Sequence, residues 1–297
     1  MIAVGYALQR FNIINQNFNS ISSKIVFNIA LPALVFNEVV KVDISNIMDF
    51  KLIEYIYVGT FVTFLLAWGI AVFFKTDPES KGAFIQGSFR GNSAIIGVAL
   101  IGNASHAMLG KTSFMLAFVI PLYNILAVIA LAFPMKHKKK LSKVQILNEI
   151  LTNPLIICMF LAMVLSAFHF KMPEVLERSV SYLAALTLPL ALIGIGSTLR
   201  NGSWKESPKL AITASLVKIV VCPILLTAGA LYFGFRGGDL LILFILFSSP
   251  TAIVSYVMAD AMGSNSRLSS SIVLISTILS IFTISAGLML LKSYGLI

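Results

Sequence analysis

The polar residues that could do chemistry in this chain lie in the middle of apolar stretches. Residues 81–105 are long and apolar enough to cross a bilayer, yet they are interrupted by Arg90, Gly91, Asn92 and Ser93. In hydrocarbon, a charge, a helix-weakening glycine and an amide are tolerated where they line a cavity or end a helix. We therefore expect a broken helix, with Asn92 and Ser93 capping its second half and presenting free N–H groups to a carboxylate. The alternative is a polar pair that only packs helices together.

A second apolar stretch, residues 240–262, has a comparable interruption at Ser249, Pro250 and Thr251. A serine before a proline is typical of a helix start, because serine caps the helix and proline is tolerated in its first turn. A proline kink without ligand contact is the alternative. Two interrupted spans in matching places of two halves indicate the binding site of a secondary transporter.

Two cations lie deep in predicted spans. Arg90 and Lys218 each follow a lysine at a span end by nine residues, which places them about 13 Å along a helix. A planar, permanently charged guanidinium suits a carboxylate substrate, and a buried lysine could hold substrate or exchange a proton. An internal ion pair is the alternative, but Asp260 is the only acid well inside a span, and it is expected near a helix end. The site is therefore predicted to be cationic, which favours an anionic ligand.

Other polar side chains at plausible depths could line the same cavity. These candidates are Asn28, Gln86, Ser88, Asn124 and Ser255. Each has a simpler interpretation as an interhelical hydrogen-bond former, which is the commoner role of such residues in membrane bundles.

Composition places all these residues in a membrane protein. The chain has 297 residues, of which 58% are hydrophobic and 11% are charged, too apolar for a soluble domain of this length. The net charge of +10 comes largely from lysines between spans. Basic residues in such loops set the orientation of a protein in the membrane, so no nucleic-acid partner is expected. Cys158 and Cys222 form neither a disulfide framework nor a metal-ligand spacing. We expect no cofactor, no metal and no enzymatic activity.

Long apolar runs predict an all-α membrane protein with ten transmembrane helices. The runs cover residues 1–9, 21–40, 52–74, 81–102, 112–133, 151–168, 175–199, 209–233, 240–262 and 268–291. The first would reach only about 14 Å at 1.5 Å per residue, roughly half a bilayer. The fourth and ninth are the interrupted spans.

The chain divides into two related halves. We predict a first five-helix repeat at 1–133, a basic cytoplasmic loop at 134–150 and a second repeat at 151–297. Pro32 aligns with Pro189 at an offset of 157 residues, and Asn92 aligns with Pro250 at an offset of 158. Because each half has an odd number of spans, the second must enter the membrane from the opposite side, which makes the repeats inverted.

The distribution of lysine and arginine between the loops predicts the orientation of the protein in the membrane. The loop at 134–150 contains Lys136, Lys138, Lys139, Lys140 and Lys143. Since cytoplasmic loops are enriched in basic residues, this loop is placed inside and both termini outside a cytoplasmic membrane.

These segments resemble the auxin efflux carrier family, which includes bacterial organic-acid carriers and plant PIN-type auxin carriers. The resemblance covers nearly the whole chain and is carried by LPAL at 31–34, QGSFRGNSAIIGVAL at 86–100, PLYN at 121–124, NPLI at 153–156, LPLALIGIGSTL at 188–199 and SSPTAIVSYVMADAMG at 248–263. It implies ten helices in two inverted repeats, with spans 4 and 9 crossing beside the substrate site. It also implies export of organic anions, and relatives of this fold can form homodimers. The Pro-Asn pair of the plant carriers at the first crossing is replaced by Gly91-Asn92 in this chain. Auxin itself is therefore not inferred as the substrate.

The sequence therefore predicts a secondary transporter that exports or exchanges small organic anions, chiefly carboxylates, by alternating access. One alternative keeps the fold and couples transport to Na⁺ or H⁺. The other is a membrane receptor or channel.

Overall fold

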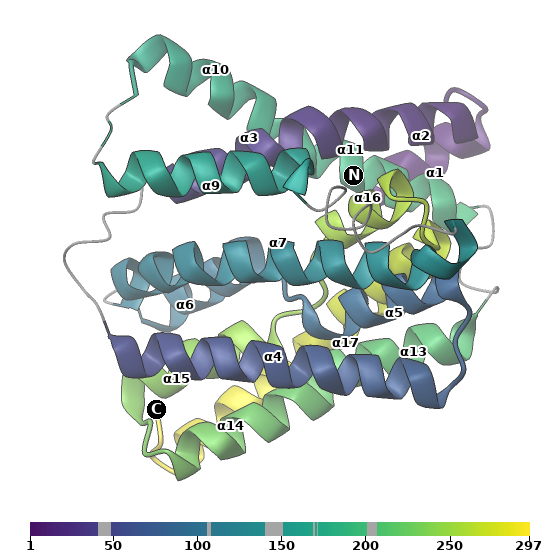
Figure 1. The fold of residues 1–297 in the computed structure, drawn as a ribbon. Coiled ribbons are helices and arrows are strands. Elements are labelled where there is room, and N and C mark those ends of the chain that lie inside the picture. Colours follow the sequence, from purple (N-terminus) through teal and green to yellow (C-terminus); the bar gives the residue numbers. More distant parts are fainter. Residues whose placement is uncertain (41–48, 106–107, 140–150, 169, 171, 201–206) are drawn as a thin grey trace.

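The chain folds into helices joined by short non-helical connections in the part that the computed structural model describes, which is all of residues 1–297 except 41–48, 106–107, 140–150, 169, 171 and 201–206 (Figure 1). The helices of the first part are α1 (Ile2–Arg10), α2 (Gln16–Ile25), the π-helical η1 (Val26–Ala30), α3 (Leu31–Val40), α4 (Phe50–Phe73), α5 (Pro78–Phe89), the π-helical η2 (Ser93–Gly97), α6 (Val98–Ala104) and α7 (Leu109–Lys139). Those of the second part are α9 (Pro154–Ala167), α10 (Glu174–Ala185), α11 (Thr187–Arg200), α13 (Pro208–Leu216), the π-helical η4 (Val217–Val221), α14 (Cys222–Tyr232), α15 (Gly237–Ser248), α16 (Val254–Ala261) and α17 (Ser266–Ser293).

Helix α7 extends into the segment predicted as the loop at 134–150. The helix continues through Pro134 as far as Lys139, so the first residues of that segment are helical. A proline inside a helix removes one backbone hydrogen bond but does not have to end the helix in a membrane protein. The rest of the segment, 140–150, lies outside the described residues.

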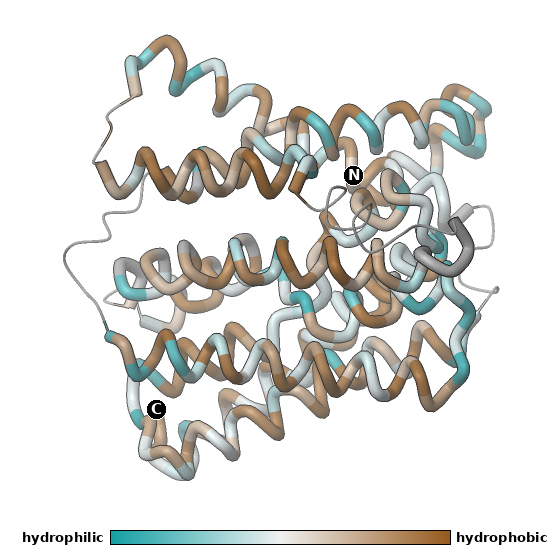
Figure 2. Tube along the Cα trace, viewed as in Figure 1, coloured by the Kyte–Doolittle hydropathy of each residue, from teal (hydrophilic) through white to brown (hydrophobic). Residues whose placement is uncertain are grey.

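Six helical segments within the described residues are long and apolar enough to cross a membrane. They are Gln16–Asn37, Phe50–Phe73, Phe114–Pro134, Glu174–Thr198, Pro208–Tyr232 and Ser266–Ser293. Hydrophobic residues dominate the helices throughout the molecule (Figure 2), and large apolar side chains such as Phe73 and Tyr232 are more than four-fifths exposed. Side chains of this kind are stable on a surface that faces lipid. The chain is therefore a multi-pass integral membrane protein.

The helices pack in two groups. In the first bundle, α1 packs on α11, and α3 packs on α9 and α10, with α2 against α11. In the second bundle, α5 packs on α4, α7 and α17, while α13, α15 and α16 pack on α17, and α14 packs on α15. The first bundle lies at the top of Figure 1 and the second below it. Each bundle takes helices from both halves of the sequence.

The short helix α1 belongs to the first bundle. An added Cβ at Gly196 of α11 would lie 2.0 Å from the carbonyl oxygen of Ile2, and one at Gly5 of α1 would lie 2.2 Å from that of Ile193. The two helix backbones can approach this closely only because both positions are glycine. The first predicted span is thus a helix of nine residues held against α11.

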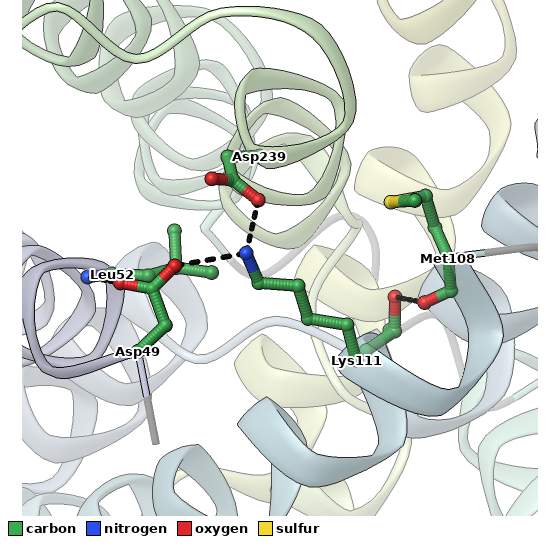
Figure 3. A network of polar contacts seen from close by, with 6 residues as sticks. Asp49, Leu52, Met108, Lys111 and Asp239 are labelled. Carbon is green, nitrogen blue, oxygen red and sulfur yellow. Dashed lines mark hydrogen bonds and ion pairs between the residues drawn. The ribbon is translucent and has the colours of Figure 1, made fainter. Parts of the chain in front are cut away.

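An ion cluster joins three helices of the second bundle (Figure 3). Lys111, in the first turn of α7, lies 2.9 Å from Asp49, the N-cap of α4, and 2.5 Å from Asp239 at the start of α15. The hydrogen bond from Lys111 lowers the pKa of Asp49 and outweighs burial, which acts in the opposite direction. Burial would lower the pKa of Lys111, but the hydrogen bonds to Asp239 and Asp49 outweigh it and raise that pKa.

Candidate functional site

The two interrupted segments meet where α5 and α15 end. Helix α5 ends at Phe89 and α15 ends at Ser248, and the extended residues that follow form an antiparallel bridge between Gly91 and Thr251. The backbone N–H of Asn92 donates to Pro250 O at 2.7 Å, and that of Ala252 donates to Arg90 O at 3.1 Å. Pairing of this kind satisfies backbone groups that the helices leave free, which a buried segment requires.

The helices that follow the two interrupted segments start in different ways. Asn92 directly precedes η2, as expected, and its carbonyl accepts from the Ile96 N–H. Helix α16 begins only at Val254, so the expectation that Ser249 and Pro250 start a helix is wrong. The reason is that the intervening residues are extended and paired with the other segment, and Ser249 instead donates to Ile245 O at the end of α15.

Two hydroxyl groups cap the helix of the opposite segment. Thr251 Oγ1 donates to Gly87 O of α5 at 2.6 Å, and Ser93 Oγ donates to Leu246 O of α15 at 3.2 Å. The last carbonyls of a helix have no partner within it, so these contacts satisfy acceptors in a dry interior. Ser93 and Thr251 therefore exchange equivalent contacts between the two segments.

Lys218 also binds the carboxyl end of α15. Its side chain is completely buried in η4, and Nζ donates to Phe247 O at 2.7 Å. A positive charge at the carboxyl end of a helix is stabilised by the helix dipole. The ammonium lies directly behind Gly91, because a Cβ added to this glycine would be 3.4 Å from Nζ.

Arg90 is buried without a carboxylate partner among the described residues. Its side chain is 5% exposed, and its guanidinium donates to Asn124 Oδ1 and to Met258 Sδ, each at 2.6 Å. Neither acceptor carries a charge, so the guanidinium charge is not neutralised by the protein groups it contacts. A buried cation of this kind attracts an anion.

A cavity of about 510 Å³ lies between the two bundles beside this crossing. The second bundle contributes Arg90, Gly91, Asn92, Ser93, Ala94, Leu116, Ile120, Tyr123, Ala252 and Val254, and the first contributes Leu31, Leu34, Val35, Asn37, Ser181, Ala184, Ala185, Thr187, Leu188 and Pro189. Most of these walls are apolar, with a few polar groups among them. Such a composition is usual for a small-molecule site.

Three of the lining residues are well buried and hold unused hydrogen-bonding atoms. These atoms, Asn92 Nδ2, Tyr123 Oη and Thr187 Oγ1, have no hydrogen-bond partner in the part of the chain that the structure describes, although each side chain is at most 6% exposed. An unpaired buried donor is costly, which makes these atoms available for a ligand acceptor.

The structure brings together only some of the predicted site residues at this cavity. Arg90, Gly91, Asn92 and Ser93 line it, whereas Ser249, Pro250, Thr251 and Lys218 form the layer behind it. Gln86, Ser88, Asn124 and Ser255 are buried without lining it, and Asn28 lies on an exposed face with its amide donating to Lys24 O.

Sequence reasoning missed several polar residues that line the cavity, among them Thr187 of the first bundle and Tyr123 of the second. For Thr187 a signal was present, since it is a polar residue two positions before Pro189 inside an apolar span. No group of three or more potential metal-binding side chains occurs among the residues described.

Comparison with known proteins gives consistent matches over nearly the full chain. The family described as "Membrane transport protein" matches residues 1–286. An uncharacterized transporter of Methanocaldococcus jannaschii is 26% identical over 96% of this chain and 94% of its own length. A protein of Rhizobium meliloti named "Putative malonate transporter" is 28% identical over 90% of this chain and 85% of its own length. An uncharacterized transporter of Methanothermobacter thermautotrophicus is 22% identical over 96% and 93%.

Proposed function

Because the chain belongs to the auxin efflux carrier family of membrane transport proteins, we propose that it is a secondary transporter that exports or exchanges small organic anions by alternating access. The substrate class is carboxylates, and the site is the cavity between the two bundles. Arg90, Gly91, Asn92 and Ser93 bind the carboxylate, and Lys218 with Ser249, Pro250 and Thr251 supports them from behind.

One observation carries the choice of an anion. Arg90 is buried beside the cavity without a neutralising carboxylate among the described residues, and the neighbouring Asn92 holds an unpaired amide N–H group. A carboxylate satisfies both groups at once, since it neutralises the guanidinium and accepts the amide hydrogen bond. A cation at the same place would be repelled by Arg90 and would lose its hydration without gaining a charged ligand.

The relatives favour the same class of substrate. One of them is named for malonate, a small dicarboxylate, which is consistent with a cationic site. Malonate is therefore the first probe, and other mono- and dicarboxylates follow.

The transport cycle is proposed to move one bundle against the other. The cavity is bounded on one side by the first bundle and on the other by the second, so relative motion changes its access to either side of the membrane. We further propose that the chain has ten transmembrane helices in two inverted five-helix repeats, 1–133 and 151–297, with the crossing segments as broken helices of spans 4 and 9. The equivalent contacts of Ser93 and Thr251 support this symmetry. The termini are placed outside the cytoplasmic membrane on the basis of the lysines.

Ligand binding to the purified protein tests the proposal. Malonate is expected to raise the midpoint of thermal unfolding in a saturable way, while malonamide, its neutral analogue of similar shape, does not. Arg90→Ala and Asn92→Ala should abolish most of the malonate effect, whereas Asn28→Ala should not change it. Equal stabilisation by both compounds, or full stabilisation of both cavity variants, contradicts the anion site. A malonate effect that requires Na⁺ would favour the cation-coupled alternative.

A further inference from the structure

The first bundle presents a helix N-terminus to the cavity, opposite the crossing segments. Helix α10 ends at Ala185, and α11 starts at Thr187 after the single residue Leu186. Thr187, Leu188 and Pro189, the first three residues of this 14-residue helix, all line the cavity. The N-terminus of a helix carries a partial positive charge and attracts anions.

The Thr187 hydroxyl is a second and independent observation that points to a ligand. The side chain is only 2% exposed, and its Oγ1 has no hydrogen-bond partner among the described residues. Threonine in a helix commonly satisfies its hydroxyl by donating to a carbonyl one turn earlier, as Thr198 does on the same helix by donating to Ile195 O. Thr187 does not use that solution, although the cost of a buried unpaired hydroxyl is substantial.

The cavity thus has two groups of donors on different bundles. Arg90 and Asn92 lie on the second bundle, and Thr187 lies on the first. The lining between them is largely apolar, including Leu31, Leu116 and Leu188. A ligand with one anionic group leaves one of these donor groups unused, whereas a ligand with two anionic groups at opposite ends can satisfy both.

We propose that Thr187 and the N-terminus of α11 form a second carboxylate-binding group, which makes the cavity selective for dicarboxylates over monocarboxylates. This inference rests on the proposed function, since it assumes that the first carboxylate binds at Arg90 and Asn92. A dicarboxylate then contacts both bundles simultaneously, and binding depends on how the bundles are placed relative to each other.

The test compares malonate with propionate, which has the same number of carbon atoms and one carboxylate fewer. Dissociation constants are measured by calorimetry for the purified protein and for Thr187→Val, which keeps the shape of the side chain and removes the hydroxyl. The variant is expected to bind malonate roughly tenfold more weakly, the effect of one lost hydrogen bond to a charged group, with propionate affinity unchanged. Thr187→Ser should recover most of the malonate affinity.

Thr198→Val is the matched control, because it makes the same change on the same helix at a similar burial but away from the cavity. It should leave both affinities unchanged. The unliganded Thr187→Val protein should unfold at the wild-type temperature or above, since the hydroxyl removed has no partner among the residues described.

Three results overturn the inference. If Thr187→Val weakens malonate and propionate equally, or weakens neither, the hydroxyl does not bind a second carboxylate, and the first site at Arg90 and Asn92 still stands. If the unliganded variant unfolds at a clearly lower temperature, the hydroxyl has a structural partner instead. If the wild-type protein binds neither compound, the proposed function fails and this inference fails with it.

Discussion

Gly91 and Thr251, which belong to different halves of the chain, form an antiparallel backbone bridge between the ends of α5 and α15. The side chain of Thr251 caps α5, and Ser93, two residues beyond Gly91, caps α15. Each segment therefore caps the helix that precedes the other segment. This reciprocity fixes the extended residues beside the cavity, which Gly91, Asn92 and Ala252 line.

Close contact at Gly91 predicts that a larger residue disturbs the crossing. An added Cβ would lie 3.1 Å from Ser93 Oγ and 3.2 Å from the backbone oxygen of Leu246, and the latter cannot move without shifting the end of α15. Gly91→Ala is expected to lower the free energy of unfolding by about 1–3 kcal/mol, as overpacking does, and to lower the thermal midpoint. Gly69→Ala is the control, because no atom lies within 4 Å of that Cβ position; its midpoint should not fall. Equal midpoints for both variants would contradict the tight crossing.

The cap that Thr251 provides for α5 predicts a hydroxyl-specific effect on stability. Thr251→Val keeps the shape of the side chain but leaves Gly87 O without its donor in a completely buried site. The loss is expected to cost about 1–3 kcal/mol. Thr251→Ser, which retains the hydroxyl, should unfold closer to the wild-type temperature. If valine were the better tolerated of the two, packing of the methyl group would matter more at this position than the hydroxyl cap.

Replacement of Lys218 is expected to reduce transport without a matching loss of stability. Replacing a buried charge with an apolar residue of similar size removes the desolvation cost of the charge, but Lys218→Met also leaves Phe247 O without its donor, at a cost of about 1–3 kcal/mol. The two effects oppose each other, so the thermal midpoint of Lys218→Met should lie close to that of the wild type. Its transport of malonate should fall by at least about tenfold, since a positive charge directly behind Gly91 attracts the anion at short range. A variant with reduced stability and undiminished transport would show that the ammonium serves only to cap α15.

The ion cluster at Lys111 predicts a stabilisation that depends on pH. The pKa of Asp49 is lowered in the folded protein, so its contribution is present above the unfolded-state value of about 3.9 and is lost as the pH falls through the lower folded-state value. The pKa of Lys111 is raised, so its contribution is present below about 10.4 and is lost as the pH rises through the higher folded-state value.

Lys111→Met is accordingly expected to lower stability near neutral pH by about 1 kcal/mol, the upper part of the range for partly exposed pairs, and by less at both extremes of pH. Thermal unfolding from pH 3 to pH 11 measures this difference. Arg178→Ala is the control, since Arg178 and Glu174 form an exposed pair with both side chains at least 70% accessible and should contribute nothing measurable. A constant Lys111→Met effect across the whole range would contradict an ionic origin.

The sequence predicted an all-helical membrane protein, because hydrocarbon demands long apolar runs and penalises charges within them. Six of the ten predicted spans coincide with helical segments that are long and apolar enough to cross a membrane among the described residues. Arg90 was informative because a charge is costly inside such a run, and Pro250 was informative because proline interrupts a helix. The chain is interrupted beside both residues. The start of α16 was misplaced, because local capping preferences for Ser249 and Pro250 could not reveal that the following residues pair with Gly91 from the other half of the chain.

The candidate site was only half predictable. Arg90 and Asn92 are unusual because polar residues are rare so deep in a membrane span. This depth can be estimated by counting residues along one predicted helix. Thr187 is an ordinary residue in a span, and the role proposed for it depends on a helix break at Leu186 and on the cavity between the two bundles. Both features depend on packing between segments distant in sequence, which the sequence alone does not specify.

Counterflow of labelled malonate in proteoliposomes tests the central claim most directly, that a carboxylate crosses the membrane by binding at Arg90 and Asn92. The wild-type protein is expected to show saturable counterflow, which Asn92→Ala reduces at least about tenfold through loss of a charge-assisted hydrogen bond, while Asn28→Ala, at the exposed face, transports normally. Unsaturable flux, or wild-type counterflow by Asn92→Ala at equal protein density, would contradict the account.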